Sequence, residues 1–132
     1  MSKTTPTIEE IKTDAAALPL GHYAQAVAHN GILYVSGQLP IDPKNTDSKF
    51  EGIKEQTLQT LKNLEAVLLA GGSSIENVLK CTIFISDISL WAEANEVYGT
   101  FFGDHRPARS AVPTKDLPRG FFIEIEAIAA QK

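Results

Sequence analysis

Residues 56–72, QTLQTLKNLEAVLLAGG, are the strongest indication of fold in this chain of 132 residues. Apolar side chains recur in and just before this stretch at the spacing of a helix with one buried face. They are Ile53, Leu58, Leu61, Leu64, Val67 and Leu68. Polar residues are expected on the other helix faces, namely Gln56, Gln59, Lys62, Asn63 and Glu65. Ser48 and Glu51 have the spacing of a capping box near the helix start, and Gly71-Gly72 is typical of a helix end.

A β-hairpin is expected before this helix. Two short runs rich in strand-forming residues, 23–28 and 32–36, flank the sequence HNG at residues 29–31. Asn-Gly is among the strongest short hairpin signals, because both of its residues accept positive φ. Residues 37–50 contain two prolines and are expected to form a loop, and residues 1–17 are expected to form a partly mobile leader.

Strand and helix patterns alternate after the helix. Residues 78–86, VLKCTIFIS, predict a central strand, because both of its faces become mostly apolar toward its end. A second helix is expected over residues 91–101, a short strand over 110–112, and a final alternating strand over 122–129. The resulting order ββαβαββ predicts an α+β fold in which two helices cover one face of a mixed sheet.

The other face of that sheet also carries apolar side chains, and two helices are too few to cover both faces. An uncovered, partly apolar face on a small protein usually contacts another subunit. The sequence therefore predicts one domain, spanning residues 1–132, that assembles into a homo-oligomer.

Charge and composition argue against several classes of function. The net charge is −4, whereas nucleic-acid binding needs a clustered basic face. The single cysteine, Cys81, excludes an intrachain disulfide and follows the pattern of a core thiol. No apolar run reaches the roughly 20 residues of a membrane span, and acidic residues occupy the place of a secretory signal. A cytoplasmic protein without a nucleic-acid or membrane partner is expected.

The sequence also lacks the common catalytic motifs. The three histidines, His22, His29 and His105, do not have the spacing of metal ligands. Neither Ser36 nor Ser110 lies in a nucleophile motif, and phosphate-binding and dinucleotide-binding glycine motifs are missing. No metal and no cofactor are therefore expected.

Three residues remain as candidates for chemistry: Arg109, Glu124 and Tyr23. Arg109 lies where a loop enters a short strand, and a guanidinium there suits a two-pronged bond with a small carboxylate. Residue type alone favours a surface arginine or a structural salt bridge instead. Glu124 interrupts an apolar strand, either as a solvent-facing residue or as an acceptor that orients a water molecule. Glu126 is a weaker candidate of the same kind.

At these residues the chain resembles the RidA/YjgF family. Residues 106–129, RPARSAVPTKDLPRGFFIEIEAIA, are similar to the C-terminal signature of that family, which pairs a P-A-R-S segment with an I-E-I-E-A-I-A strand. Similar segments include YVSGQLPIDP (34–43), QTLQTLKNLEAVLLAGG (56–72), VLKCTIFISDI (78–88) and ANEVYGTFF (94–102). The resemblance covers nearly everything from about residue 18 to the end.

The resemblance implies a chorismate-mutase-like α+β fold and a homotrimer, in which three sheets form a barrel-like core with clefts between neighbouring subunits. It implies hydrolysis of 2-imino acids, or their 2-enamine tautomers, to 2-keto acids and ammonia without a cofactor. Three alternatives stay open. They are a non-catalytic carboxylate binder or chaperone-like oligomer, an RNA-directed translation inhibitor or ribonuclease, and a deaminase of another small carboxylate such as aminomuconate.

The resemblance also assigns roles to residues. Arg109 matches the arginine that binds the substrate carboxylate, Glu124 the glutamate that places the attacking water, and Tyr23 a tyrosine that lines the cleft. Further residues expected at the cleft are Ser36, Gly37, Asn95 and Ala111. Two positions depart from the family pattern, because His22 replaces a usual proline and Ala111 a frequent cysteine. Both departures concern substrate preference more than the type of reaction.

Overall fold

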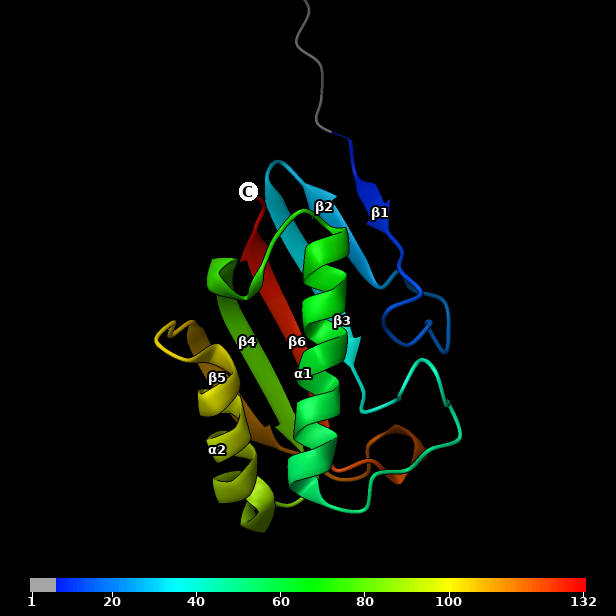
Figure 1. Ribbon diagram of the computed structural model, residues 1–132, viewed down its shortest axis with the longest axis vertical. Helices are drawn as coiled ribbons and strands as arrows, with labels where there is room; N and C mark the ends of the chain where they lie inside the picture. Colours follow the sequence, from blue (N-terminus) through cyan, green and yellow to red (C-terminus); the bar gives the residue numbers. More distant parts are fainter. Residues whose placement is uncertain (1–6) are drawn as a thin grey trace, which may run out of the picture.

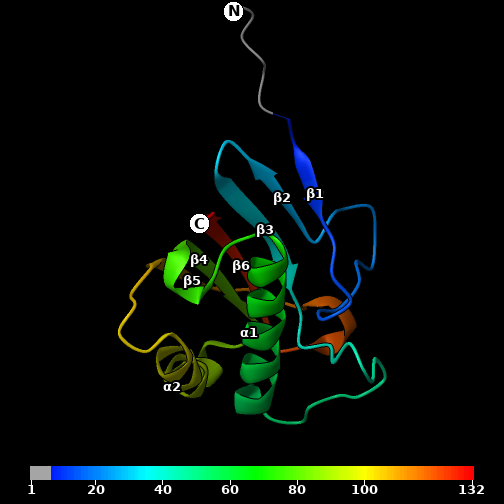
Figure 2. The same ribbon diagram turned by 45° about the horizontal axis from the view of Figure 1, so that its top comes forward.

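A six-stranded sheet in the order β1-β2-β3-β6-β4-β5 carries both long helices on one face (Figures 1 and 2). The structure is a computed structural model that describes residues 7–132. The strands are β1 (Glu9–Ile11), β2 (Ala26–His29), β3 (Ile32–Gln38), β4 (Val78–Ile85), β5 (Ala108–Pro113) and β6 (Ile123–Ala130). The long helices are α1 (Ile53–Ala70) and α2 (Trp91–Phe102), and short 3-10 helices are η1 (Ile75–Asn77), η2 (Ile88–Leu90) and η3 (Pro118–Gly120).

The sheet is mixed, because β4 and β5 run parallel while every other neighbouring pair is antiparallel. The last strand, β6, lies in the middle of the sheet between β3 and β4. These features confirm the predicted α+β class, with two helices on one face and residues 78–86 as an inner strand.

The β2–β3 hairpin forms as the Asn-Gly pair predicts. Asn30 and Gly31 have φ values of 53° and 83°, so both residues adopt the left-handed conformation that a tight two-residue turn requires. The hairpin brings β2 against β3, with Ala26 opposite Val35 and His29 opposite Ile32.

Helix α1 packs its apolar stripe against β3 and β6, with Leu61, Leu64, Val67 and Leu68 fully buried. Two expected positions are wrong: Leu58 is 39% exposed, and Gln56 is buried, where its amide donates to the Phe50 carbonyl of the preceding loop. The predicted capping box is wrong. The N-cap is Gly52 without a capping side chain, and Ser48 belongs to the preceding loop, where its N–H donates to the Asn45 carbonyl. The helix ends at the predicted glycines, where the Gly71 N–H donates to the Val67 carbonyl.

Strand β1 lies inside the segment expected to be a leader, so the order is βββαβαββ instead of the predicted ββαβαββ. Glu10 pairs with Val27 of β2, and Ile11 is buried. A run of three residues that includes two glutamates is too short and too polar to predict a strand. Residues 1–6 of the expected leader lie outside the described residues.

The alternation in β6 divides the sheet into two different faces. Ile123, Ile125, Ala127 and Ala129 are buried on the face that the helices cover. The side chains between them point to the opposite face, which we call the open face. Its rows of paired residues are Tyr34–Ile128–Lys80, Glu126–Thr82–Ser110 and Glu124–Phe84–Val112. Neither long helix covers this open face (Figure 2).

Candidate functional site

Arg109 lies on β5, the edge strand next to β4, and points to the helix side of the sheet. In the parallel register it pairs with Cys81, which is fully buried on that side. Its Nη1 donates a hydrogen bond to Asn95 Oδ1 over 2.7 Å. Its Cζ lies 4.8 Å from the ring centroid of Trp91 and 4.9 Å from that of Tyr98. Helix α2 therefore supplies every one of these contacts.

Glu124 lies on the open face, in the row that it shares with Phe84 and Val112. Burial raises the pKa of Glu124, and the neighbouring Glu126 carboxylate raises it further. A glutamate in this position holds a proton to higher pH than an ordinary glutamate does. Its carboxylate, once ionised, is therefore a stronger proton acceptor than that of an ordinary glutamate.

Gly37 lies at a bulge in β3, where the pairing with β6 shifts register between Val35 and Gln38. A Cβ atom at Gly37 would lie 2.9 Å from Glu124 Cδ, which is closer than non-bonded carbon atoms approach. Only glycine therefore leaves the Glu124 carboxylate where it is, against the backbone of β3.

The side chains of Ser36 and Tyr23 both form hydrogen bonds to the backbone of the segment that leads into β2. Ser36 Oγ donates to the Ala24 carbonyl over 2.7 Å, which fixes this segment to β3. The Tyr23 hydroxyl accepts a hydrogen bond from the Leu20 N–H over 3.1 Å, so the tyrosine ring folds back over its own turn. Both contacts are structural, and they leave the Tyr23 ring about half exposed.

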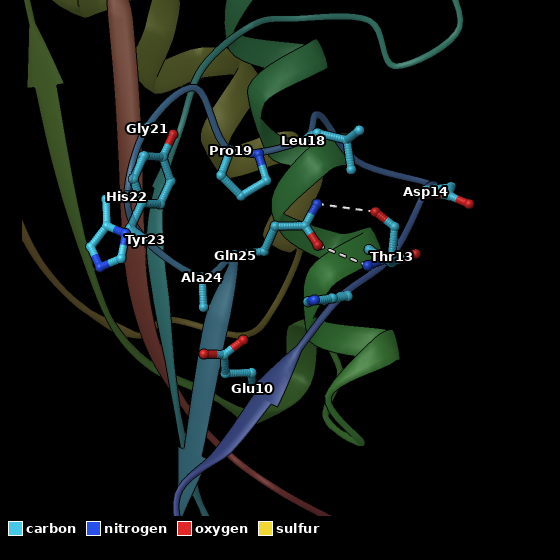
Figure 3. A pocket seen from close by; sticks show the side chains of 11 residues that line it. Glu10, Thr13, Asp14, Leu18, Pro19, Gly21, His22, Tyr23, Ala24 and Gln25 are labelled. Carbon is cyan, nitrogen blue, oxygen red and sulfur yellow. Dashed lines mark hydrogen bonds between the residues drawn. The ribbon is translucent and has the colours of Figure 1, made fainter.

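Tyr23 lines a cavity of about 540 Å³ together with His22 and residues of the segment after β1. Figure 3 shows Tyr23 and His22 on one side of this cavity, Thr13 and Asp14 on the other, and Gln25 between them. The Gln25 amide bonds to the backbone of Thr13 through both of its polar atoms.

The predicted site residues thus form two separate groups within one chain. Glu124 and Gly37 lie together on the open face, whereas Arg109 and Asn95 lie together on the helix side. Ala111 lies two residues beyond Arg109 on β5 and is exposed. Within one chain, the two groups point to opposite faces of the sheet.

Sequence reasoning missed two contacts of Arg109, the rings of Trp91 and Tyr98. Their signal was the helical spacing of residues 91, 95 and 98, which places three side chains on one stripe of a helix. The position of Arg109 beside this stripe follows only from the parallel pairing of β4 with β5.

The remaining titratable groups near Arg109 belong to the core. Burial raises the pKa of Cys81 to about 11, so its thiol is protonated at neutral pH. His105 Nε2 lies 2.7 Å from the Val78 carbonyl.

Within residues 7–132, no three His, Cys, Asp or Glu side chains are grouped as ligands of a metal ion. No helix of the described part is long and apolar enough to span a membrane.

A family model described as Endoribonuclease L-PSP matches residues 13–131. The chain belongs to this family, which is the RidA/YjgF family. A RutC family protein of Pyrococcus horikoshii is 45% identical over 121 residues, which are 92% of this chain and 96% of that protein. The 2-iminobutanoate/2-iminopropanoate deaminase of Rattus norvegicus is 42% identical over 121 residues, which are 92% of this chain and 88% of the deaminase.

Solved structures agree with this membership of the RidA/YjgF family. The crystal structure of E. coli TdcF with bound serine superimposes with a TM-score of 0.89 at 35% identity, covering 94% of this chain and 99% of TdcF. The names within the family differ, since they include an endoribonuclease and a deaminase.

Proposed function

We propose that this chain hydrolyses small 2-imino acids, and their 2-enamine tautomers, to 2-keto acids and ammonia. The observation that carries the proposal is the Arg109 guanidinium, held at the edge strand by one hydrogen bond and two aromatic rings. A guanidinium has five N–H donors, so the bond to Asn95 leaves enough of them for a two-pronged bond with a substrate carboxylate. Membership of the RidA/YjgF family and likeness to the rat deaminase support this reaction.

The proposal includes a homotrimer with its sites between subunits. Every residue of β5 is exposed in the single chain, and Tyr34 and Val112 leave apolar surface on the open face. A second copy that covers this edge and this face would bring its Arg109 toward Glu124 of the first. Contact of this kind would explain how Arg109 and Glu124 can serve one site although they lie on opposite faces of the sheet in a single chain.

The reaction needs one positioned water molecule. We infer that Arg109 holds the carboxylate and that Glu124 accepts a proton from water about 3 Å from the imine carbon. The water oxygen bonds to that carbon as the C=N π bond breaks. Both protons of the water pass to the nitrogen, one of them by way of Glu124, and the C–N bond then breaks to give the keto acid and ammonia. An imine carbon is already electrophilic, so a carboxylate acceptor and an oriented substrate suffice.

A non-catalytic binder of small carboxylates is the second candidate. The structure of TdcF with bound serine, an amino acid that carries a carboxylate, favours it. Binding would use Arg109 in the same way but would not turn over an imine. The endoribonuclease description of the family adds a third candidate, which the net charge of −4 disfavours, because RNA binding relies on basic surface.

In the test, threonine dehydratase generates 2-iminobutanoate in situ. The amount of imine that remains is measured over time by trapping it as its semicarbazone. Wild-type protein should deplete the imine, and Arg109→Ala should lower kcat/KM by about 10- to 100-fold, as expected for loss of hydrogen bonds to a charged group. Arg119→Ala is the matched control, because the Arg119 Cζ also lies over an aromatic ring, 5.3 Å from the Phe121 centroid, but Arg119 lies in η3 and not on β5.

Arg119→Ala should retain the wild-type rate. If the wild type depletes no short imino acid but binds 2-oxobutanoate through Arg109, the binder replaces the deaminase. If the wild type instead degrades RNA, the ribonuclease function replaces the deaminase function.

A further inference from the structure

We propose that Trp91, Asn95 and Tyr98 form a positioning platform that fixes the Arg109 guanidinium before any ligand arrives. We call these three residues of α2 the arginine platform. The inference rests on the proposed function only for the identity of the ligand, a small carboxylate that Arg109 then binds. The platform itself is argued from contacts within a single chain.

Helix geometry places the three residues on one stripe. Residues four and seven positions after Trp91 return to the same side of an α-helix, and these are Asn95 and Tyr98. Tyr98 is only 6% exposed, and its ring centroid lies 4.6 Å from that of Phe102. The core therefore holds the Tyr98 ring in place. The rigid helix then fixes the positions of Asn95 and Trp91 relative to Tyr98.

The platform holds a cation with groups that carry no net charge. The Asn95 amide oxygen accepts one hydrogen bond from Arg109, and the two ring faces attract the guanidinium electrostatically. Among the described residues, the only ion pair between side chains is Lys54–Glu96, so no carboxylate neutralises Arg109. A salt bridge would also have fixed the guanidinium, but it would have occupied the charge that an incoming carboxylate needs.

Fixing Arg109 in advance should act on binding. A free arginine side chain loses many rotamers when it binds a ligand, whereas a preoriented one has lost them on folding. Binding energy of this kind is shared by the bound substrate and the transition state. Loss of the platform should therefore raise KM with little change in kcat.

The experiment compares Trp91→Leu, which removes the ring face, with Trp91→Phe, which restores a ring. Phe101→Leu is the control, because it removes an aromatic ring of the same helix that is not among the contacts of Arg109. The first measurement is the NMR spectrum of the arginine side chains. Ring currents shift the Arg109 Nε–H and Cδ–H signals, and Arg109→Lys identifies those signals by their loss.

Trp91→Leu should move the Arg109 signals toward those of exposed arginines, and Trp91→Phe should restore part of the shift. The second measurement is steady-state hydrolysis of 2-iminobutanoate. Trp91→Leu should raise KM by about three- to tenfold, with kcat within about twofold of the wild type. Phe101→Leu should change neither the Arg109 signals nor KM.

Failure of the two proposals can be told apart. If Trp91→Leu leaves the Arg109 signals in place, the platform is overturned, whatever the activity. If those signals move while KM is unchanged or kcat falls instead, the positioning role is overturned. If no protein hydrolyses the imine, the proposed function fails. The platform is then decided by the NMR signals and by the affinity for 2-oxobutanoate, which Trp91→Leu should weaken by the same factor.

Discussion

At the scale of single residues, the two proposed site residues have opposite electrostatic surroundings. Arg109 touches an amide and two aromatic rings, and it has no ion-pair partner among the described side chains. Glu124 is half buried beside the carboxylate of Glu126, and both burial and this neighbour raise its pKa. The proposed hydrolysis uses both groups: the cation binds the substrate carboxylate, and the carboxylate with the raised pKa accepts a proton from water.

The raised pKa of Glu124 predicts the acid side of the pH profile. Glu124 accepts a proton from water only when it is ionised, so kcat/KM should fall as the pH drops through this raised pKa. The fall should therefore come at higher pH than for an ordinary glutamate. Glu124→Gln should lower kcat by about 10²- to 10⁴-fold and remove this pH dependence, measured as kcat/KM for 2-iminobutanoate against pH.

Glu126→Gln is the control variant for Glu124→Gln. The Glu126 charge raises the pKa of Glu124, so removing it should move the acid side of the profile to lower pH while hydrolysis continues. Profiles that coincide for the wild type and Glu126→Gln would contradict the assignment of this limb to Glu124.

At the scale of elements, buried amides fix two irregular segments of the chain, the loop after β3 and the segment after β1. Asn63 of α1 donates to the carbonyls of Leu39 and Ile41, over 2.9 and 2.8 Å, and so holds the loop after β3. Gln25 bonds to the backbone of Thr13 and Ala17 and holds the segment after β1. These loops are ordered by side chains that bond to their backbone.

Gln25→Leu should release the segment between β1 and β2. Gln25 is 2% exposed and makes three hydrogen bonds to the backbone, so its loss should lower the free energy of unfolding by about 2–3 kcal/mol. It should also speed proteolysis within residues 12–20. Urea denaturation at one protein concentration and limited proteolysis with mass spectrometry measure these effects.

Gln59→Leu serves as the control for Gln25. Its amide bonds only to the Asn63 side chain on the same helix, over 3.0 Å, and its loss should lower the free energy of unfolding by about 0.5 kcal/mol. Equal losses for the two variants would show that Gln25 does not hold the segment.

At the scale of the whole molecule, we propose that the open face and the exposed edge strand β5 contact another copy of the chain. Val112 on the open face is 38% exposed in the single chain, and Leu58 on the outward side of α1 is 39% exposed. A single chain should tolerate a charge equally well at both positions, since surface substitutions usually change stability by less than about 0.5 kcal/mol. A trimer assembled through its sheets should tolerate the charge only at Leu58.

Light scattering after gel filtration tests this assembly. The wild type should have the mass of three chains of 14.3 kDa, which is about 43 kDa. Val112→Lys should shift the mass toward one chain, whereas Leu58→Lys should leave it unchanged. A wild type with the mass of one chain would exclude sites between subunits.

The sequence by itself determined the local elements. The periodicity of residues 56–72, the Asn30-Gly31 turn and the alternation in β6 each depend on neighbours within a few positions, and all three predictions are confirmed. The family signature also lies in contiguous segments, so membership of the RidA/YjgF family could be read from the sequence.

Only the tertiary structure decided which of these residues meet. Asn63 follows the pattern of an outward polar residue, yet it is buried because the loop after β3 crosses its face of α1. Arg109 and Glu124 point to opposite faces because their partners on β4 are Cys81 and Phe84, three residues apart on a strand whose successive side chains alternate between the faces. Strand order and register are set by contacts between residues far apart in the chain, and such contacts leave no periodicity in the sequence.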